Sequence, residues 1–507
     1  MKLLFEYQLT KAFDINKIGI QLIEYENSIE IYNDPFRTVP LFVTKDDAGE
    51  LIIFSKYEDY YKFEMEDRIV DQAGFWEIVL FGSTLWTRTL HKKVEQMAAA
   101  MCLKVDKQNE KYSFKCYWSY DVVEDRSIQS LEQAADGMYL VLDSIFSSLN
   151  KKEHYLLGMS GGLDSRITLA FLSRHIPESN IKLFTYGFNE KILEYVYAKA
   201  VAVSLGIAVP DFHPLTMKSY KDALEYLPSM SGGQISINHC HILDYMINTE
   251  LHDYRHISTY YSDALFGYDC TYPKRIETIE KNYYAEAVSA QLGIPPEIRK
   301  VIIDDSYKIF SRFDTESNFS SLSEFKYVTE RNQKFHMYLA SLQGSLVSTD
   351  VLYANMKLLR FALSIPLKYR QNKKIIDALL LKYFPEISSR DFKNISSRDF
   401  RSVTPGFQWG SKISGLANWY LFRFLNRVNS VLRVITGGTI QFFNKYQTEE
   451  HERHLYSEFK DDLLAATAKF VEMGIMSAEQ KIEFDRLPVR NTGVAERYAL
   501  ISMAKII

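Results

Sequence analysis

Cysteine is scarce in this sequence, which contains only four in 507 residues. They are Cys102, Cys116, Cys240 and Cys270. No two of them form a Cys-x-x-Cys pair, the spacing that is typical of zinc sites and redox motifs. So few thiols in so long a chain favour a reducing compartment, and we expect them to be buried apolar side chains.

Long apolar runs are also missing. Near the start of the chain, Glu6 comes too early for the apolar core of a signal peptide to form. The apolar stretch over residues 351–367 is interrupted by Lys357 and Arg360, so we do not expect it to span a membrane. These absences predict a cytoplasmic protein.

Charge of one sign is not in excess. The net charge is -4 and there is no basic tail or long Lys/Arg run, so we do not expect a nucleic-acid partner. A hydrophobic fraction of 47% and a charged fraction of 24% are typical of soluble globular proteins. A chain of 507 residues predicts two or three domains. The 34 Tyr and 32 Phe indicate large cores or an apolar substrate pocket, and composition leaves both open.

The N-terminal quarter is rich in strand patterns. Residues 18–31 and 38–55 alternate or cluster β-branched and aromatic side chains, with turn signals between the two runs. A second hairpin is expected over residues 101–120, around a polar turn. We therefore predict an α+β domain with an antiparallel sheet over residues 1–125.

Strands alternate with helices in residues 126–415. The pattern predicts strands at 155–159, 181–186 and 256–260, and helices at 131–149, 166–172 and 192–205. Such alternation is typical of βαβ units and of a parallel sheet covered on both faces, so the fold class is α/β. Ligands of these sheets bind at the carboxyl ends of the strands. Residues 416–507 are expected to form a helical C-terminal extension.

One glycine-rich turn follows the first of these strands. It reads Ser160-Gly161-Gly162-Leu163-Asp164-Ser165. Glycines let backbone N–H groups approach an anion, and the helix that follows offers its positive end. The hydroxyls of Ser160 and Ser165 can donate to phosphate oxygens, and Asp164 beside an anion requires a cation such as Mg²⁺. The alternative is a helix-capping turn with a solvated aspartate.

This turn resembles the pyrophosphate-binding loop, Ser-Gly-Gly-x-Asp-Ser, of the N-type ATP pyrophosphatases. That superfamily includes asparagine synthetases, GMP synthetases and tRNA-thiolating enzymes. A chance match to the five fixed positions is expected roughly once per thousand chains of this length. Three more segments resemble asparagine synthetases: residues 184–188, with Tyr186 and Gly187 on the adenosine side; residues 262–268; and residues 33–42, similar to a turn of their glutaminase domain.

The resemblance runs from about residue 20 to 385 and implies ATP and Mg²⁺ as cofactors. It implies a Rossmann-like ATP pyrophosphatase domain behind an N-terminal-nucleophile (Ntn) glutaminase-like domain. By its alignment, Asp263 is the second Mg²⁺ ligand beside Asp164. The residues agree, because two carboxylates, each after a parallel strand, are the minimum to hold Mg²⁺ against a triphosphate. The alternative for Asp263 is a turn aspartate.

Three positions depart from the family pattern. Glutamine-dependent relatives carry a nucleophilic cysteine directly after the initiator methionine, where this chain has Lys2. A lysine cannot perform thiolate acyl chemistry, so the N-terminal domain is expected to be degenerate and glutamine is not the nitrogen source. Ala264 replaces the glutamate of an Asp-Glu pair, and residues 351–354 replace a Pro-Phe-x-Asp segment. These changes spare the ATP loop and leave open a weakened or non-catalytic member.

Tyr260 stands where asparagine synthetases have glutamate and where β-lactam and carbapenam synthetases have tyrosine. In the latter the tyrosine, paired with a glutamate, deprotonates the attacking amine. A phenol with a pKa of about 10 needs such a carboxylate partner, and Glu286 and Glu297 are candidates by chain distance. The alternative for Tyr260 is a core aromatic.

Relatives stabilise the tetrahedral intermediate with a lysine from a C-terminal loop. That loop corresponds to residues 389–409, a polar segment in which Lys393, Arg398 and Arg401 are candidates. His239 and His241 suggest a metal site. Their i, i+2 spacing points them in different directions on a helix, which favours packing instead.

Without a glutaminase, the amine is expected to belong to the substrate. The chain is therefore expected to join a carboxylate and an amine, of a small molecule or a peptide, in natural-product tailoring such as lactam formation. The lasso-peptide macrolactam cyclases are one such group, and they require partner proteins. The alternatives are ammonia-dependent amidation of an amino-acid or sugar carboxylate, and a nucleotide-binding pseudoenzyme in a biosynthetic complex.

Overall fold

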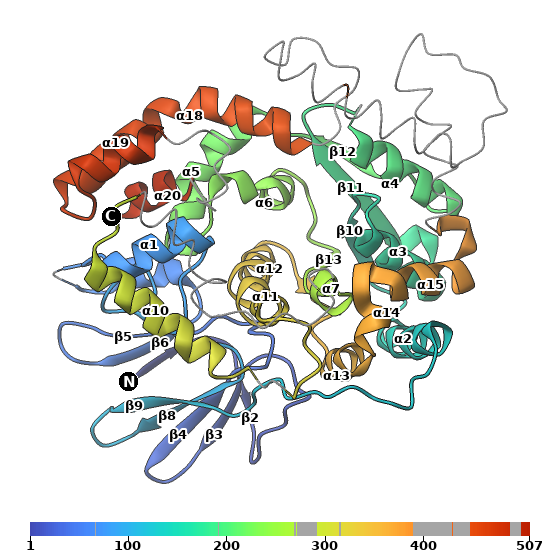
Figure 1. Ribbon diagram of the computed structural model, residues 1–507, viewed down its shortest axis with the longest axis horizontal. Coiled ribbons are helices and arrows are strands. Elements are labelled where there is room, and N and C mark those ends of the chain that lie inside the picture. Colours follow the sequence, from blue (N-terminus) through green and yellow to red (C-terminus); the bar gives the residue numbers. More distant parts are fainter. Residues whose placement is uncertain are drawn as a thin grey trace.

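The computed structural model describes most of the chain. The described residues are 1–65, 67–190, 192–267, 270, 292–313, 316–388, 428, 447–486 and 498–507. Two small sheets formed by the N-terminal residues lie at one end of the molecule, and a parallel sheet with its helices lies at the other (Figure 1).

The N-terminal sheets pack face to face. One has the order β1-β6-β5-β7, and the other has the order β2-β3-β4-β8-β9. Their strands are β1 (Lys2–Leu4), β2 (Gln8–Leu9), β3 (Gln21–Glu24), β4 (Ser28–Tyr32), β5 (Phe42–Lys45), β6 (Leu51–Phe54), β7 (Glu95–Gln96), β8 (Met101–Asp106) and β9 (Tyr112–Cys116). Ile31 and Leu103 of one sheet share an apolar core with Val43 and Ile53 of the other. Most pairs are antiparallel, and β1–β6 and β2–β3 are parallel.

The sheet at the other end of the molecule is parallel throughout and has the order β12-β11-β10-β13-β14. Its strands are β10 (His154–Gly158), β11 (Ile181–Gly187), β12 (Asp211–Pro214), β13 (Tyr254–Ile257) and β14 (Thr349–Asp350). The chain starts in the middle, adds strands on one side, and then returns to the other side of β10. The strand order therefore reverses between β10 and β13, and ligands of such sheets bind outside the carboxyl ends at this point.

Helices cover both faces of this sheet (Figure 1). They include α2 (Leu131–Phe146), α3 (Leu163–His175), α4 (Leu193–Ser204), α5 (Met217–Ser231), α6 (His241–Ile247), α7 (Ser262–Leu265), α13 (Met356–Ser364), α14 (Leu367–Arg370) and α15 (Lys374–Tyr383). On β10, Tyr155 and Leu157 belong to the main core, which also contains Phe171 of α3. Leu156, between them, packs in a separate cluster with Tyr245 of α6. Burial on both faces explains why β10 reads as a continuous apolar run.

The other helices connect the two ends of the molecule. They are α1 (Gln72–Phe81), α10 (Pro296–Phe310), α11 (Leu322–Lys326), the π-helix η4 (Tyr327–His336), α12 (Met337–Gly344), α18 (Gln447–Glu472), α19 (Ala478–Arg486) and α20 (Ala499–Ile506). Helix η4 touches both ends. Lys334 Nζ donates to the Thr84 carbonyl of the N-terminal region at 3.0 Å, and the Tyr261 hydroxyl, which follows β13, donates to the Val328 carbonyl at 3.1 Å. Helix α20 packs against α5 and α18.

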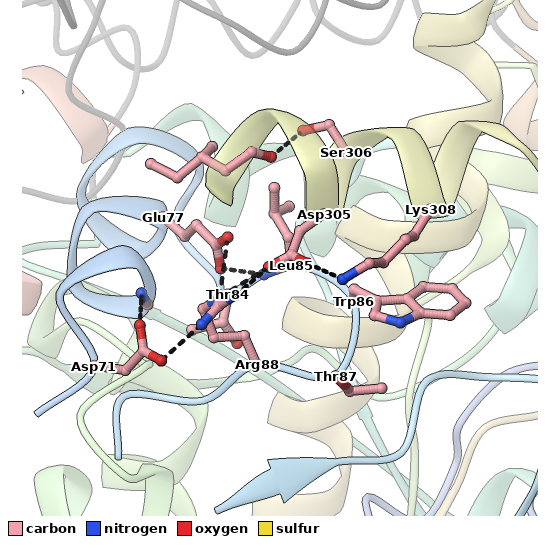
Figure 2. Close-up of polar contacts among 12 residues, drawn as sticks. Asp71, Glu77, Thr84, Leu85, Trp86, Thr87, Arg88, Asp305, Ser306 and Lys308 are labelled. Atoms are coloured by element: carbon pink, nitrogen blue, oxygen red, sulfur yellow. Dashed lines mark hydrogen bonds and ion pairs between the residues drawn. The ribbon is translucent and has the colours of Figure 1, made fainter. Parts of the chain in front are cut away.

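A buried polar group joins α1 to α10, and Figure 2 shows its contacts. Arg88 lies at its centre, with Nη1 2.6 Å from Asp71 Oδ2 and Nη2 2.7 Å from Asp305 Oδ2. Its Nε lies 3.6 Å from Glu77 Oε1, and the other oxygen of Glu77 accepts from the Leu85 N–H at 2.7 Å. We call Asp71, Glu77, Arg88 and Asp305 the Arg88 cluster. It fixes the N-terminal region to the rest of the chain.

The expectations for the cysteines and for the apolar runs can be compared with the described residues. All four cysteines are free thiols; Cys102, Cys240 and Cys270 are buried, and Cys116 is partly exposed. Among the described helices, none combines the length and the apolarity that crossing a membrane requires.

Candidate active site

The glycine turn joins β10 to α3 at the point where the strand order reverses. Gly161 has φ +70°, a conformation that residues with a side chain rarely adopt. A Cβ at this position would also lie 2.3 Å from Tyr197 Cβ and 3.0 Å from the Ala198 nitrogen, both in α4. Backbone conformation and close packing therefore both require glycine here.

The turn leaves the first N–H groups of α3 without a side-chain cap. Gly162 is the N-cap residue and makes no side-chain bond to the helix. Within the turn, the Ser160 and Ser165 hydroxyls lie 3.3 Å apart, and the Gly162 N–H donates to Ser160 Oγ at 3.3 Å. These contacts are long and easily exchanged for a ligand. An uncapped helix start of this kind can bind an anion.

Asp164 and Asp263 meet at one ammonium group. Asp164 lies in the first turn of α3, and Asp263 lies in the short helix α7 that follows β13. Lys373 Nζ lies 3.0 Å from Asp164 Oδ2 and also bonds to Asp263 Oδ1. The Ser262 hydroxyl donates to Asp164 Oδ1 at 2.9 Å. The structure therefore brings together the two carboxylates that the sequence singled out, and their role as metal ligands stays a prediction.

The electrostatics of these three groups favour a cation between the carboxylates. Burial, together with the neighbouring Asp164, raises the pKa of Asp263 to about 6 in spite of Lys373. Burial acts to lower the pKa of Lys373, but the two carboxylates outweigh it and the pKa is raised. Among the described residues, no group of three His, Cys, Asp or Glu side chains could hold a metal. Two carboxylates beside an anion-binding turn fit Mg²⁺, which usually takes one or two carboxylates and phosphate oxygens.

Lys373 is a site residue that sequence reasoning missed. It ends a 3₁₀ turn (η5, Gln371–Lys373), immediately before α15. Cations at the start of a helix are disfavoured by the helix dipole. The pair Lys373-Lys374 at such a position was therefore a signal in the sequence that could have indicated a functional lysine.

Tyr186 and Gly187 lie at the carboxyl end of β11, next to the turn. The Met159 N–H, just before the turn, donates to the Phe184 carbonyl at 2.8 Å, and this couples β11 to the turn. The Tyr186 ring lies 5.0 Å from the ring of His241, and burial raises the pKa of Tyr186. The adenosine role of Tyr186 and Gly187 stays a prediction.

Tyr260 lies between the end of β13 and α7, and its contacts with described residues are with uncharged groups. Its hydroxyl accepts from Gln343 Nε2 at 3.4 Å, and its ring stacks on His336 at 5.3 Å. Burial lowers the pKa of His336 to about 3 and raises the pKa of Tyr260 to about 12. Among the described residues, no carboxylate bonds to this hydroxyl. Glu297, one suggested partner, is exposed in the first turn of α10.

Several predicted residues lie elsewhere. Lys393, Arg398, Arg401 and Glu286 are outside the described residues. His239 packs edge-on against Phe335. His241 lies beside Tyr186, and these aromatic contacts agree with the packing interpretation of both histidines.

The two departures near Asp263 lie beneath the site. Ala264 is buried, and so is Tyr353 of the segment that replaces Pro-Phe-x-Asp. The Tyr353 hydroxyl lies 2.7 Å from Thr168 Oγ1, which itself donates to the Asp164 carbonyl at 2.7 Å. Tyr353 therefore supports the first turn of α3 through Thr168. The replacement of the Pro-Phe-x-Asp segment is compatible with an intact glycine turn.

The comparison with family sequence models points to the same region. Residues 140–313 match the sequence model of the asparagine synthase family. The matched segment contains the glycine turn and Asp263, and it supports the resemblance to asparagine synthetase-like ATP pyrophosphatases there. No curated protein matches the chain. Among solved structures, the chain is similar to the NH3-dependent NAD synthetase from Campylobacter jejuni, solved in complex with a nitrate ion. The identity is 16%, the match covers 41% of this chain and 96% of that chain, and the TM-score is 0.20.

Proposed function

We propose that this protein is an ATP-dependent amide-bond synthetase. It adenylates a substrate carboxylate, releasing pyrophosphate, and then joins the acyl group to an amine, releasing AMP. One observation carries this proposal. Asp164 and Asp263, which follow two neighbouring parallel strands, converge beside an uncapped glycine turn within the segment that matches asparagine synthase.

The turn supplies the groups that a polyphosphate needs. The free N–H groups at the start of α3 and the hydroxyls of Ser160 and Ser165 donate to phosphate oxygens. Asp164 and Asp263 would hold Mg²⁺, which neutralises the charge that develops on pyrophosphate as it leaves. Lys373 lies close enough to Asp164 and Asp263 to add a second positive charge beside the phosphates. Arranged before the reaction, such donors stabilise the charge of the transition state.

On the expected amine side of the site, the described partners of Tyr260 are the uncharged side chains of Gln343 and His336. With a pKa of about 12, Tyr260 is protonated at neutral pH, and its phenolate amounts to roughly one molecule in 10⁵. Tyr260 and Gln343 can therefore orient an amine through hydrogen bonds, whereas another group must remove the proton of that amine. In this proposal the substrate itself supplies the amine. This favours natural-product or peptide tailoring, such as lactam closure.

Pyrophosphate exchange tests the first half of the reaction. Wild-type protein is incubated with ATP, Mg²⁺ and labelled pyrophosphate against a panel of carboxylates. We expect label in ATP with a particular carboxylate, and a loss of at least 100-fold in Asp164→Asn. Asp143→Asn is the matched control, because Asp143 lies on α2 and pairs with His175 at 2.8 Å, away from the turn.

Some synthetases require the amine or a partner protein before chemistry begins, so a second round adds candidate amines and protein partners. If the protein binds ATP but forms neither AMP nor pyrophosphate in that round, the synthetase proposal is wrong. A nucleotide-binding role in a biosynthetic complex would then replace it.

A further inference from the structure

The ammonium of Lys373 occupies the position between two carboxylates where a metal ion is expected. It contacts Asp164 and Asp263 at the same time, and the Lys373 side chain is 15% exposed. The carboxylates are more accessible, at 22% for Asp164 and 40% for Asp263. A ligand that approaches from solvent can therefore reach the carboxylates, whose negative charge is already partly neutralised by the Lys373 ammonium.

The backbone around Lys373 is built to place this side chain. Asn372 and Lys373 both have left-handed conformations, with φ of 55° and 56°. Asparagine tolerates this region, but lysine adopts it only where the surroundings require it, and such strain gathers at functional sites. The next residue differs, because Lys374 is exposed and donates to the Lys368 carbonyl at 3.3 Å. One lysine of the pair therefore points into the site and the other does not.

The segment that carries Lys373 is held firmly at its start. Arg370 is buried and donates from Nη1 to Glu324 Oε1 at 2.5 Å. Gly267, which follows α7, has φ +80°, and a Cβ there would lie 2.5 Å from the Arg370 carbonyl oxygen. The turn after Asp263 and the residues before Lys373 are thus in direct contact. The anchor is rigid, whereas the lysine has four methylene groups that let its ammonium move.

We propose that Lys373 takes the place of the divalent cation in the nucleotide-free protein, so that the two aspartates accept a metal only as a metal–polyphosphate complex. The site is the one used in the proposed function, and the inference rests on it. A bare metal ion would lie beside the ammonium and, within the part of the chain that the structure describes, would find no group of three metal-binding side chains. A metal–polyphosphate complex brings further oxygen ligands and also supplies anionic oxygens to which the displaced ammonium can move.

Binding of Mn²⁺, followed by electron paramagnetic resonance, tests this proposal without any turnover. Without nucleotide, Lys373→Met is expected to bind Mn²⁺ at least tenfold more tightly than the wild type. Lys374→Met is the matched control and is expected to bind like the wild type. The double variant Lys373→Met/Asp263→Asn is expected to lose the gain, which would locate the metal at this site.

A Lys373→Met protein that folds but binds Mn²⁺ no better than the wild type would overturn the proposal. If this variant does not fold, Mn²⁺ binding to the wild type, with and without nucleotide, tests the proposal. A non-hydrolysable ATP analogue is then expected to tighten Mn²⁺ binding at least tenfold, and equal affinity with and without it would overturn the proposal. These outcomes are separate from pyrophosphate exchange. A protein that shows the expected Mn²⁺ binding but no adenylation would disprove the proposed function alone.

Discussion

Two clusters in this molecule place a cation among carboxylates, and they differ in how deeply some of those carboxylates are buried and in the kind of cation. In the Arg88 cluster, Glu77 is fully buried and Asp305 is 3% exposed. In the Lys373 group, Asp263 is 40% exposed. The planar guanidinium of Arg88 bonds several partners in fixed directions, whereas the ammonium of Lys373 is a point charge on a flexible chain.

This difference separates a structural arrangement from an exchangeable one. Charges that are buried together must stay together, because removal of one partner leaves the others without solvent. Charges that are partly exposed are screened by water and can change partners at little cost. The Arg88 cluster therefore fixes α1 to α10, and the Lys373 group can open for a ligand. The same substitution of the cation by methionine should therefore change the free energy of unfolding by a large amount at Arg88 and by a small amount at Lys373.

The largest effect on stability is expected from Arg88→Met. This substitution removes the guanidinium that Asp71, Glu77 and Asp305 share, whereas Lys308 still pairs with Asp305 at 2.8 Å. The free energy of unfolding should fall by about 3–5 kcal/mol. Urea denaturation measures it. Arg174→Met is the control, because Arg174 is exposed and its pair with Asp143 at 3.6 Å should contribute under about 1 kcal/mol. A loss for Arg88→Met as small as that of the control would contradict a structural role.

A smaller effect, visible as a pH dependence, is expected from Glu77→Gln. Burial raises the pKa of Glu77 well above its ordinary value, with Asp305 adding to it. The folded protein therefore keeps the proton of Glu77 to a higher pH than the unfolded chain does, so the titration of Glu77 makes stability fall as pH rises. The slope is at most about 1.4 kcal/mol per pH unit. Urea denaturation between pH 5 and 8 should show a weaker fall in Glu77→Gln than in the wild type, and identical slopes would contradict the prediction.

The smallest effect on stability is expected from Lys373→Met. Because Asp263 is partly exposed, the carboxylates remain solvated when the ammonium is removed, and the free energy of unfolding should change by less than about 1 kcal/mol. Urea denaturation beside Arg88→Met gives a direct comparison. A loss as large as that of Arg88→Met would mean that Lys373 is a structural cation, and the distinction between the two clusters would disappear.

The parts that the sequence predicted are those with local signals. The strand before the glycine turn, the turn itself and α3 follow from an apolar run, two glycines and helical spacing. The parallel sheet follows from the alternation of such units. The proximity of Asp263 to Asp164 depended on the family resemblance, because 99 residues separate them and no periodic pattern connects them.

The parts that were missed depend on geometry that has no periodic pattern. Lys373 reaches the site through two consecutive left-handed residues, which the sequence Asn372-Lys373 does not reveal. The partners of Tyr260 come from a π-helix, which contains His336, and from α12, which follows it and contains Gln343. Helices with this hydrogen-bond pattern are rare and have no established sequence signal. The carboxylate partner that the resemblance suggests for Tyr260 stays a prediction, because Glu286 lies outside the described residues.

The contacts of Arg166 have a consequence for how the molecule unfolds. This buried guanidinium donates to the Gly161 carbonyl at 2.7 Å and to the Ile387 carbonyl at 3.3 Å. It therefore connects the glycine turn to a backbone segment 221 residues away along the chain. Opening of either segment alone would leave a buried cation with unsatisfied donors. The glycine turn and the segment around Ile387, which follows α15, are thus expected to open as one cooperative unit. Their backbone N–H groups should stay protected from hydrogen exchange until larger parts of the domain open together.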